Sequence, residues 1–181
     1  MKDSVLVIGL GSMGKRRIRN LQAIGVKNIA GFDTRTDRLT EAEKNYNVAT
    51  YNDFNEAISK NSFTAFVISV PPDAHYIYMR KALELNIPAF VEASVVDTDL
   101  EFIKAEKEKK KVLIAPSCTL YFHPAIKKIC EIVTSGELGQ ISNFLYHSGQ
   151  YLPDWHTYEK VSDFYVSNKA TGGAREIVPF E

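Results

Sequence analysis

The chain has 181 residues, a length sufficient for one full domain and part of a second. Hydrophobic residues make up 45% of it, an ordinary share for a protein with a globular core. Lys and Arg together number 22, as do Asp and Glu, so the formal net charge is zero and no strong field favours nucleic acid or an anionic membrane. The longest apolar runs, such as residues 65–70, are too short to span a bilayer, and the N-terminus leads directly into a strand-like segment. These properties predict a cytoplasmic protein whose partner is a small molecule or another protein.

The two cysteines, Cys118 and Cys130, have no His or Cys neighbour at the spacing of metal ligands, and both lie among apolar residues. We therefore expect both to be reduced residues that pack in the interior, and we expect no metal site.

Short β-branched runs alternate with segments of helical period over the first 116 residues, a pattern typical of a parallel sheet wrapped by helices. The predicted strands are residues 4–9, 28–33, 48–51, 64–70, 89–93 and 112–115. The predicted helices run from near residue 12 to near 25, over 37–46 and 53–60, around 78–85, and over about 97–110.

The rest of the chain has a different character. A helix is expected in "HPAIKKICEIVTSGELG", with Pro124 in its first turn and Gly136 as its stop, and the next segment, residues 141–149, is expected to be a strand. Residues 150–173 show no period, and a loop of that length is usually either functional or a sign that the elements were wrongly assigned. One helix and one or two strands are too few to close a second sheet, so the second domain is expected to be incomplete.

Three glycines between the first strand and the first helix have the spacing Gly9-x-Gly11-x-x-Gly14. In a dinucleotide site these residues permit a tight turn, a close approach of the backbone to the pyrophosphate, and close packing of helix on sheet. The pyrophosphate would meet the free N–H groups at the start of the helix, where Ser12 and Met13 lie.

Asp33 ends the second strand, 19 residues after Gly14. Its carboxylate would accept hydrogen bonds from the adenosine ribose and repel a 2′-phosphate, which favours NAD, whereas the nearby cation of Arg35 leaves NADP open. The simpler interpretation is a glycine turn followed by a capping Asp. The combined pattern predicts a doubly wound α/β fold of Rossmann type over residues 1–118, followed by an incomplete α/β second domain over residues 119–181.

Further candidates for the cofactor site follow the fourth and fifth strands. The fourth ends at Val70 and leads into Pro71, Pro72 and His75, and the fifth ends with Glu92. Ligands of open α/β sheets bind outside these strand ends. His75 is alternatively a capping or packing residue, and Glu92 is alternatively the capping partner of a helix.

These residues, together with "AFVISVPPDAH" (65–75), "VEASV" (91–95), "YFHPAIKKI" (121–129) and "GGAREIVPFE" (172–181), resemble the Gfo/Idh/MocA family of oxidoreductases. The resemblance implies a Rossmann domain followed by an α/β domain whose open sheet covers the nicotinamide and often forms dimers. It further implies NAD or NADP as cofactor and hydride transfer on a sugar, amino sugar or sugar nucleotide, in a setting such as polysaccharide synthesis. A homo-oligomer would form through the C-terminal part.

The chain departs from the family pattern at three positions. Ala93 stands where the family has the Lys of Glu-Lys-Pro, Phe180 aligns with a His that faces the nicotinamide, and Tyr121 replaces a frequent Arg. Dinucleotide binding is therefore predicted more firmly than turnover. The alternatives to an oxidoreductase are a catalytically silent dinucleotide-binding protein that regulates or scaffolds a partner, and a truncated remnant.

If there is turnover, the base must come from another residue. The available titratable groups are Tyr151, His156, Lys169 and Glu176. Of these, His156 is the first choice because its reference pKa is nearest neutrality, with a structural role as its alternative.

Overall fold

A computed structural model describes residues 3–149, 151–155, 157 and 159–180. The chain divides into two compact units. The first comprises Met1–Glu92 and Val96–Ser117, and the second comprises Ala93–Val95 and Cys118–Glu181.

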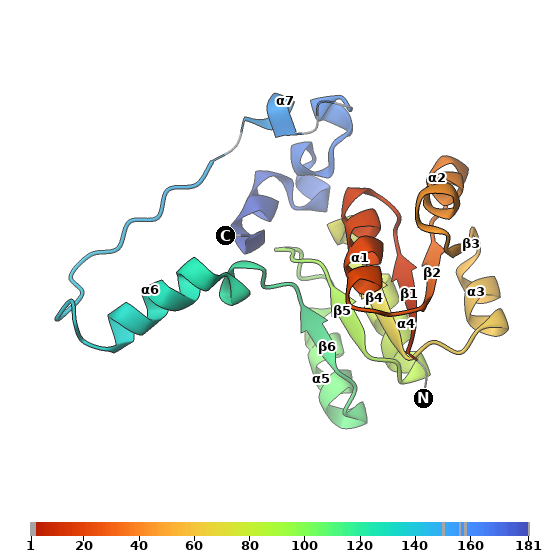
Figure 1. The fold of residues 1–181 in the computed structure, drawn as a ribbon, viewed down its shortest axis with the longest axis horizontal. Helices are drawn as coiled ribbons and strands as arrows, with labels where there is room; N and C mark the ends of the chain where they lie inside the picture. Colours follow the sequence, from red (N-terminus) through yellow and green to blue (C-terminus); the bar gives the residue numbers. More distant parts are fainter. Residues whose placement is uncertain (1–2, 150, 156, 158, 181) are drawn as a thin grey trace. The chain divides into compact units, whose positions relative to one another are not determined.

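The first unit is built on a six-stranded parallel sheet in the order β3-β2-β1-β4-β5-β6 (Figure 1). This is the doubly wound order, which reverses between β1 and β4 and leaves a crevice at their carboxyl ends. The prediction of a Rossmann-type α/β fold is confirmed. The strands are β1 (Ser4–Ile8), β2 (Asn28–Phe32), β3 (Ala49–Tyr51), β4 (Ala65–Ile68), β5 (Ala89–Val91) and β6 (Ile114–Pro116).

Helices cover both faces of this sheet, so its central strands are apolar throughout rather than alternating. Four of the five residues of β1 are buried. The helices are α1 (Ser12–Ala23), α2 (Thr36–Tyr46), α3 (Phe54–Lys60), α4 (His75–Leu85) and α5 (Leu100–Lys110), and a 3-10 turn over Pro72–Ala74 precedes α4.

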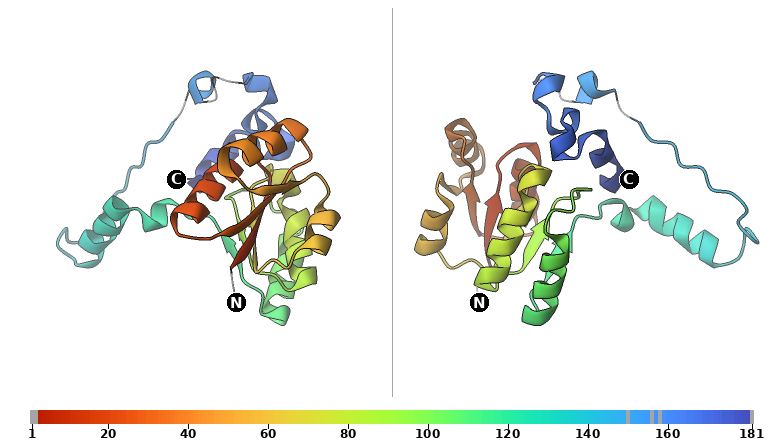
Figure 2. Two further views of the ribbon diagram at one scale, coloured as in Figure 1. Left: turned by 45° about the vertical axis from the view of Figure 1, so that its right-hand side comes forward. Right: turned by 180° about the vertical axis from the view of Figure 1, so that it is seen from behind.

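Two hydrophobic cores lie on opposite faces of the sheet. One contains Ile18 of α1 and Leu39 of α2, and the other contains residues of α3, α4 and α5, among them Phe54 and Ile103. Figure 2 shows α4 and α5 on the face opposite that seen in Figure 1. The helices α1 and α2 thus pack on one face, and α3, α4 and α5 pack on the other. Both cores include residues of β1 and β4, the strands that support the crevice.

The second unit contains α6 (Pro124–Thr134), the four-residue helix α7 (Leu152–Trp155) and several 3-10 turns, the last over Gly173–Phe180. Pro124 occupies the first turn of α6, as predicted. The expectation of a strand over residues 141–149 is wrong: these residues are extended but exposed, and the described part of this unit contains no strand to pair with them. A lone strand cannot satisfy its backbone hydrogen bonds, so β-like composition alone did not produce one.

The expectation that both cysteines pack in the interior is also wrong. Both are free thiols, and both are exposed. Cys118 comes just after Ser117, the buried residue that follows β6. Cys130 lies in α6, which has no fully buried residue, so its apolar neighbours in the sequence do not enclose it.

None of the helices in the described part of the chain combines the length and the apolar character that a membrane span requires.

Candidate functional site

The turn after β1 has room only for glycine at its first and last glycine positions. Gly9 has a φ of +89°, and a Cβ there would lie 2.6 Å from the carbonyl oxygen of Ser69. A Cβ on Gly14 would lie 1.8 Å from the carbonyl oxygen of Gly9. Because neither backbone oxygen can move aside, the glycines let α1 begin directly against the end of β1.

The N-terminus of α1 is suited to an anion. Gly11 is its N-cap, no side chain caps the helix, and its first turn has no acidic residue. The three atoms nearest to a Cβ on Gly11 all belong to the Arg38 guanidinium, at 3.7–3.9 Å, so no backbone atom crowds this position. Exposed N–H groups at the positive end of a helix dipole fit a pyrophosphate.

Asp33, just after β2, is the buried acid of this region, with 6% of its surface exposed. Its Oδ2 accepts a hydrogen bond from the N–H of Leu10 at 2.7 Å and one from Arg38 Nη1 at 3.3 Å, and its Oδ1 accepts one from the N–H of Arg35 at 2.9 Å. These bonds fix the carboxylate on the loop after β1. Each carboxylate oxygen has two acceptor positions, so Oδ1 retains one for a ligand.

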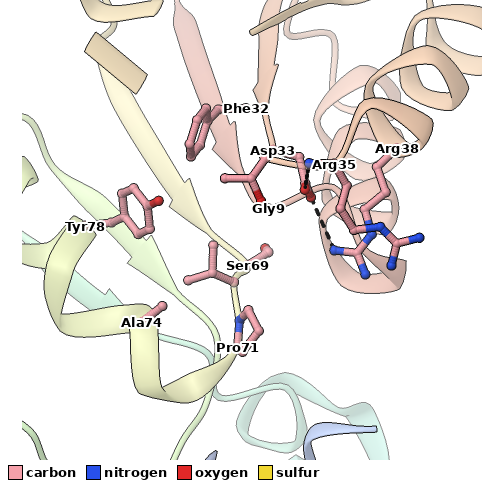
Figure 3. Close-up of a pocket in the computed structure, with 11 residues that line it drawn as sticks. Gly9, Phe32, Asp33, Arg35, Arg38, Ser69, Pro71, Ala74 and Tyr78 are labelled. Carbon is pink, nitrogen blue, oxygen red and sulfur yellow. Dashed lines mark hydrogen bonds and ion pairs between the residues drawn. The ribbon is translucent and has the colours of Figure 1, made fainter. Parts of the chain in front are cut away.

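Asp33 lines a cavity of about 310 Å³ in the first unit (Figure 3). The cavity lies at the carboxyl ends of β1, β2 and β4, as expected for the crevice of an open α/β sheet. It is lined by Gly9, Phe32, Asp33, Thr34, Arg35, Arg38, Ser69, Val70, Pro71, Ala74 and Tyr78.

The wall opposite Asp33 is largely apolar. The Tyr78 ring packs against Phe32 at 5.9 Å and Phe54 at 5.5 Å between ring centroids, and its hydroxyl points into the cavity (Figure 3). Burial, followed by the negative charge of Asp33, raises the pKa of Tyr78. The hydroxyl therefore stays protonated at neutral pH and can donate a hydrogen bond. An apolar slot with a carboxylate at its edge matches the chemistry of an adenosine.

His75 is buried at the start of α4, and its Nε2 lies 3.0 Å from the carbonyl oxygen of Val70. Because a carbonyl only accepts, we assign the ring proton to Nε2. Burial lowers the pKa of His75, against the smaller opposing effects of the Val70 hydrogen bond and of the charges on Glu92 and Asp73. The ring is thus neutral near pH 7, and it pins the loop that follows β4.

Glu92 forms a buried ion pair with Arg17 of α1. Arg17 Nε and Nη2 donate to the two carboxylate oxygens at 2.6 and 2.9 Å, and the Ser69 hydroxyl lies 3.3 Å from Oε1. The guanidinium also sits 4.7 Å from the centroid of the Phe90 ring. Glu92 therefore joins the end of β5 to α1 and β4, and does not cap a helix.

In the second unit, Glu176 is fully buried. Its Oε1 accepts hydrogen bonds from the Ser94 hydroxyl at 3.1 Å and the N–H of Val95 at 2.9 Å. Its Oε2 is the one buried side-chain polar atom without a hydrogen-bond partner in the part of the chain that the structure describes. Such an atom calls for an explanation, and a catalytic role is one.

The structure brings only part of the predicted set together. Five of the predicted cofactor residues line the cavity, namely Gly9, Asp33, Arg35, Val70 and Pro71. The other members of the glycine turn, Gly11, Ser12, Met13 and Gly14, lie at the N-terminus of α1. Pro72, His75 and Glu92 are buried and do not line the cavity.

None of the predicted bases that the structure describes belongs to the first unit. Tyr151 is 70% exposed and Glu176 is buried, and both belong to the second unit. Lys169 lies in a 3-10 turn of the same unit and is exposed. His156 lies outside the described residues.

Sequence reasoning missed Arg17, Arg38 and Tyr78. A signal for the two arginines was available: both lie in the N-terminal half of a helix, where a cation opposes the helix dipole. A basic residue at such a position indicates a nearby anionic partner, here Glu92 for Arg17 and Asp33 for Arg38.

Comparison with known proteins agrees with this geometry. The model of the Gfo/Idh/MocA oxidoreductase family, with an NAD-binding Rossmann fold, matches residues 4–115. No curated protein sequence matches the chain significantly.

Several solved structures share the fold. Myo-inositol 2-dehydrogenase from Lactobacillus plantarum has a TM-score of 0.72 and 20% identity, over 78% of this chain and 43% of that one. The WlbA dehydrogenase from Bordetella pertussis, solved with NADH and UDP-GlcNAcA, has a TM-score of 0.70 and 14% identity, over 77% and 44%. A probable dehydrogenase from Thermotoga maritima has a TM-score of 0.67 and 25% identity, over 75% and 42%. The chain thus spans less than half the length of these structures.

Proposed function

Because the chain belongs to the Gfo/Idh/MocA family of NAD-binding oxidoreductases, we propose that it holds the adenosine of NAD or NADP in the cavity beside Asp33 and acts in hydride transfer. The proposed substrate is a sugar, amino sugar or sugar nucleotide. Among the matched structures, one is an inositol dehydrogenase and another was solved with NADH and UDP-GlcNAcA, which supports this class.

The observation that carries the cofactor proposal is the placement of Asp33. Its carboxylate is buried and fixed by two backbone N–H groups, yet it lines the cavity with acceptor capacity to spare. A fixed acceptor at the end of β2 suits the vicinal hydroxyls of a ribose. The glycine turn next to it leaves the start of α1 open for the pyrophosphate.

The nicotinamide supplies the hydride chemistry when bound, and the chain must supply a group that moves the hydroxyl proton of the substrate. Of the three predicted catalytic residues, Glu176 has the strongest support, because Ser94 and Val95 hold one of its oxygens and leave the other unpaired. Ser94 comes two residues after Glu92, in the segment that contains Ala93 in place of the family lysine. We propose Glu176 as the proton acceptor, with His156 and Tyr151 as further candidates.

Cofactor binding is tested by titrating the protein into NADH and following nicotinamide fluorescence. We expect Asp33→Ala to raise the Kd for NADH by about tenfold or more, since hydrogen bonds to a charged acceptor are lost. Glu84→Gln, a change at an exposed acid of α4, is the matched control and should leave the Kd unchanged. Failure of the wild type to bind NADH at millimolar concentration would refute the proposal.

Turnover is tested by screening sugars and sugar nucleotides for a change in nicotinamide absorbance. With a substrate in hand, Glu176→Gln should lower kcat by about 100-fold or more while the Kd for NADH stays the same, as expected on loss of a general base. Tyr151→Phe and His156→Asn should have smaller effects. A fully active Glu176→Gln variant would remove Glu176 from the mechanism.

A specific observation favours a second candidate, a catalytically silent dinucleotide-binding protein. Ala93 is buried and has no group that can move a proton, at the position where the family has lysine. This candidate predicts that NADH binds and that Asp33→Ala weakens binding, with no turnover on any sugar.

A further inference from the structure

We infer that the substrate is a sugar with a free ammonium group beside the reacting hydroxyl, and that Glu176 recognises this ammonium. The inference rests on the proposed function, because it chooses among the substrate classes named there. It is argued from residues of the second unit alone.

Glu176 is a buried negative charge without a positive partner. Its two donors, the Ser94 hydroxyl at 3.1 Å and the N–H of Val95 at 2.9 Å, are both neutral and both bind Oε1, while Oε2 has no hydrogen-bond partner. None of the ion pairs in the described part of the chain includes Glu176. Buried carboxylates are almost always paired, because an unpaired charge is costly to remove from water. The surroundings of Oε2 therefore lack a cation.

The backbone around Glu176 offers acceptors. A side chain on Gly172 would collide with the carboxylate, so the turn is closed tightly over it without a polar group of its own. At the next residue, a Cβ on Gly173 would lie 3.7 Å from the carbonyl oxygen of Asn168 and 3.9 Å from that of Val166. Carbonyl oxygens and a carboxylate on one turn favour a ligand that donates hydrogen bonds and carries positive charge.

The two positions of this unit that could supply a cation from the chain do not do so. Arg175 directly precedes Glu176, but its Nε donates to the carbonyl oxygen of Gly172 at 3.3 Å. Ala93 is buried next to Ser94, at the position where the family has lysine. The missing charge is therefore one that a ligand can supply.

An ammonium fits this place better than a metal ion. Among the residues that the structure describes, no group of three or more His, Cys, Asp and Glu side chains could hold a metal. A divalent cation needs several such ligands. An ammonium has three N–H donors and can be held by one carboxylate with carbonyl oxygens beside it.

Selection between substrates would take place when the turn closes. Oε2 is covered in this structure, so a substrate reaches it only after the turn over Gly173–Phe180 has moved. Gly172 and Gly173, with φ of +97° and +63°, stand at the start of this turn and suit a hinge. Closure over a neutral sugar buries the carboxylate unpaired, whereas closure over an ammonium pairs it.

The ammonium is also compatible with the proposed reaction. Oε2 has two acceptor positions, so it can accept a hydrogen bond from the ammonium and the proton of the neighbouring hydroxyl. The carbon that bears the hydroxyl gives its hydride to the oxidised cofactor, the hydroxyl proton moves to Oε2, and the carbon–oxygen bond becomes a carbonyl. The ammonium is unchanged, and its charge stabilises the negative charge that develops on the hydroxyl oxygen.

The test is isothermal titration calorimetry of sugars into the protein saturated with NADH, where no turnover occurs because the cofactor is already reduced. The ligands are glucosamine, galactosamine and mannosamine, each compared with its parent hexose and with its N-acetyl derivative, which has nitrogen at the same position without the charge. We expect at least one hexosamine to bind about tenfold or more tightly than both of its comparison sugars, as for a charge that pairs with a buried partner.

Glu176→Gln removes the charge and keeps the size of the side chain, so the hexosamine should then bind within about twofold of its comparison sugars. Glu131→Gln, at an exposed acid of α6, is the matched control and should keep the preference of the wild type. Circular dichroism confirms that both variants are folded. If Glu176→Gln does not fold, the comparison of sugars on the wild type decides alone.

The inference is overturned if the wild type binds no hexosamine more tightly than the comparison sugars, including the case in which none of the sugars binds. It is also overturned if a folded Glu176→Gln variant keeps the full preference. A wild type that binds NADH and prefers a neutral sugar overturns the inference and leaves the proposed function standing. A wild type that does not bind NADH overturns both.

Discussion

The ion pair between Arg17 and Glu92 allows a prediction about stability that can be worked from its geometry. The pair is bidentate, and the two side chains are 18% and 9% exposed. Unit charges about 4 Å apart attract by about 4 kcal/mol at an effective dielectric constant of about 20, and removing one partner of a buried pair costs about 3–5 kcal/mol. Because Arg17 retains some contact with water, we take the lower end of that range.

Glu92→Gln and Arg17→Met should each lower the free energy of unfolding by about 3 kcal/mol, which is about 6–12 °C in Tm for a chain of this size. The double variant should be no less stable than either single variant, since it leaves no unpaired buried charge. Urea unfolding followed by far-UV circular dichroism measures the effect. Fluorescence of the single tryptophan, Trp155, reports separately on the second unit.

The matched control is Lys104→Met, which breaks the exposed pair with Glu101 on α5. Exposed pairs contribute little, so this variant should unfold within experimental error of the wild type. The reasoning fails if the coupling energy of Arg17 and Glu92, taken from the full cycle, is below about 0.5 kcal/mol.

Three further outcomes are expected. Gly14→Ala should lower Tm and abolish NADH binding, because its Cβ would collide with a backbone oxygen. The control is Gly149→Ala, whose Cβ would meet nothing within 4 Å and which should change neither property. A Gly14→Ala variant that binds NADH normally would contradict this prediction. The pKa of His75 is lower in the folded state than its ordinary 6.5, so unfolded chains bind more protons below that pH. The contribution of His75 to the free energy of unfolding should therefore be fully present above about pH 6.5 and should be lost as the pH falls through the folded-state pKa. Urea unfolding at several pH values measures this dependence, and His75→Gln should flatten it. Finally, Cys118 and Cys130 should both react with a thiol reagent in the native protein as fast as in urea, and slow reaction of either would disprove its exposure.

Much of the first unit could be predicted because its signals are local. The apolar run of β1 is buried by helices on both faces, and the glycine turn is constrained by its own backbone. Residues 141–149 had an equally strand-like composition, but a strand also needs a partner, and composition does not contain that information. Local patterns therefore predicted strands correctly where the rest of the chain completed the sheet.

The candidate site divides in the same way. Asp33 could be predicted from its spacing to the glycines, because one βαβ unit sets both positions. Arg17 and Glu92 are 75 residues apart, and only the fold brings them together. The Arg35 side chain contacts Asp37 and the Arg38 side chain contacts Asp33, a detail of side-chain direction at the start of α2 that spacing does not fix.

The membership of Ala93–Val95 in the second unit has a consequence for the order of events during synthesis. The carboxylate that accepts the bond from the N–H of Val95 belongs to Glu176, 81 residues later. At about 5–20 residues per second, translation adds Glu176 roughly 4–16 seconds after Val95. The strands on either side of this short segment can leave the ribosome and pair in that interval, so a nascent chain would leave the segment after β5 without this partner until Glu176 has been synthesised.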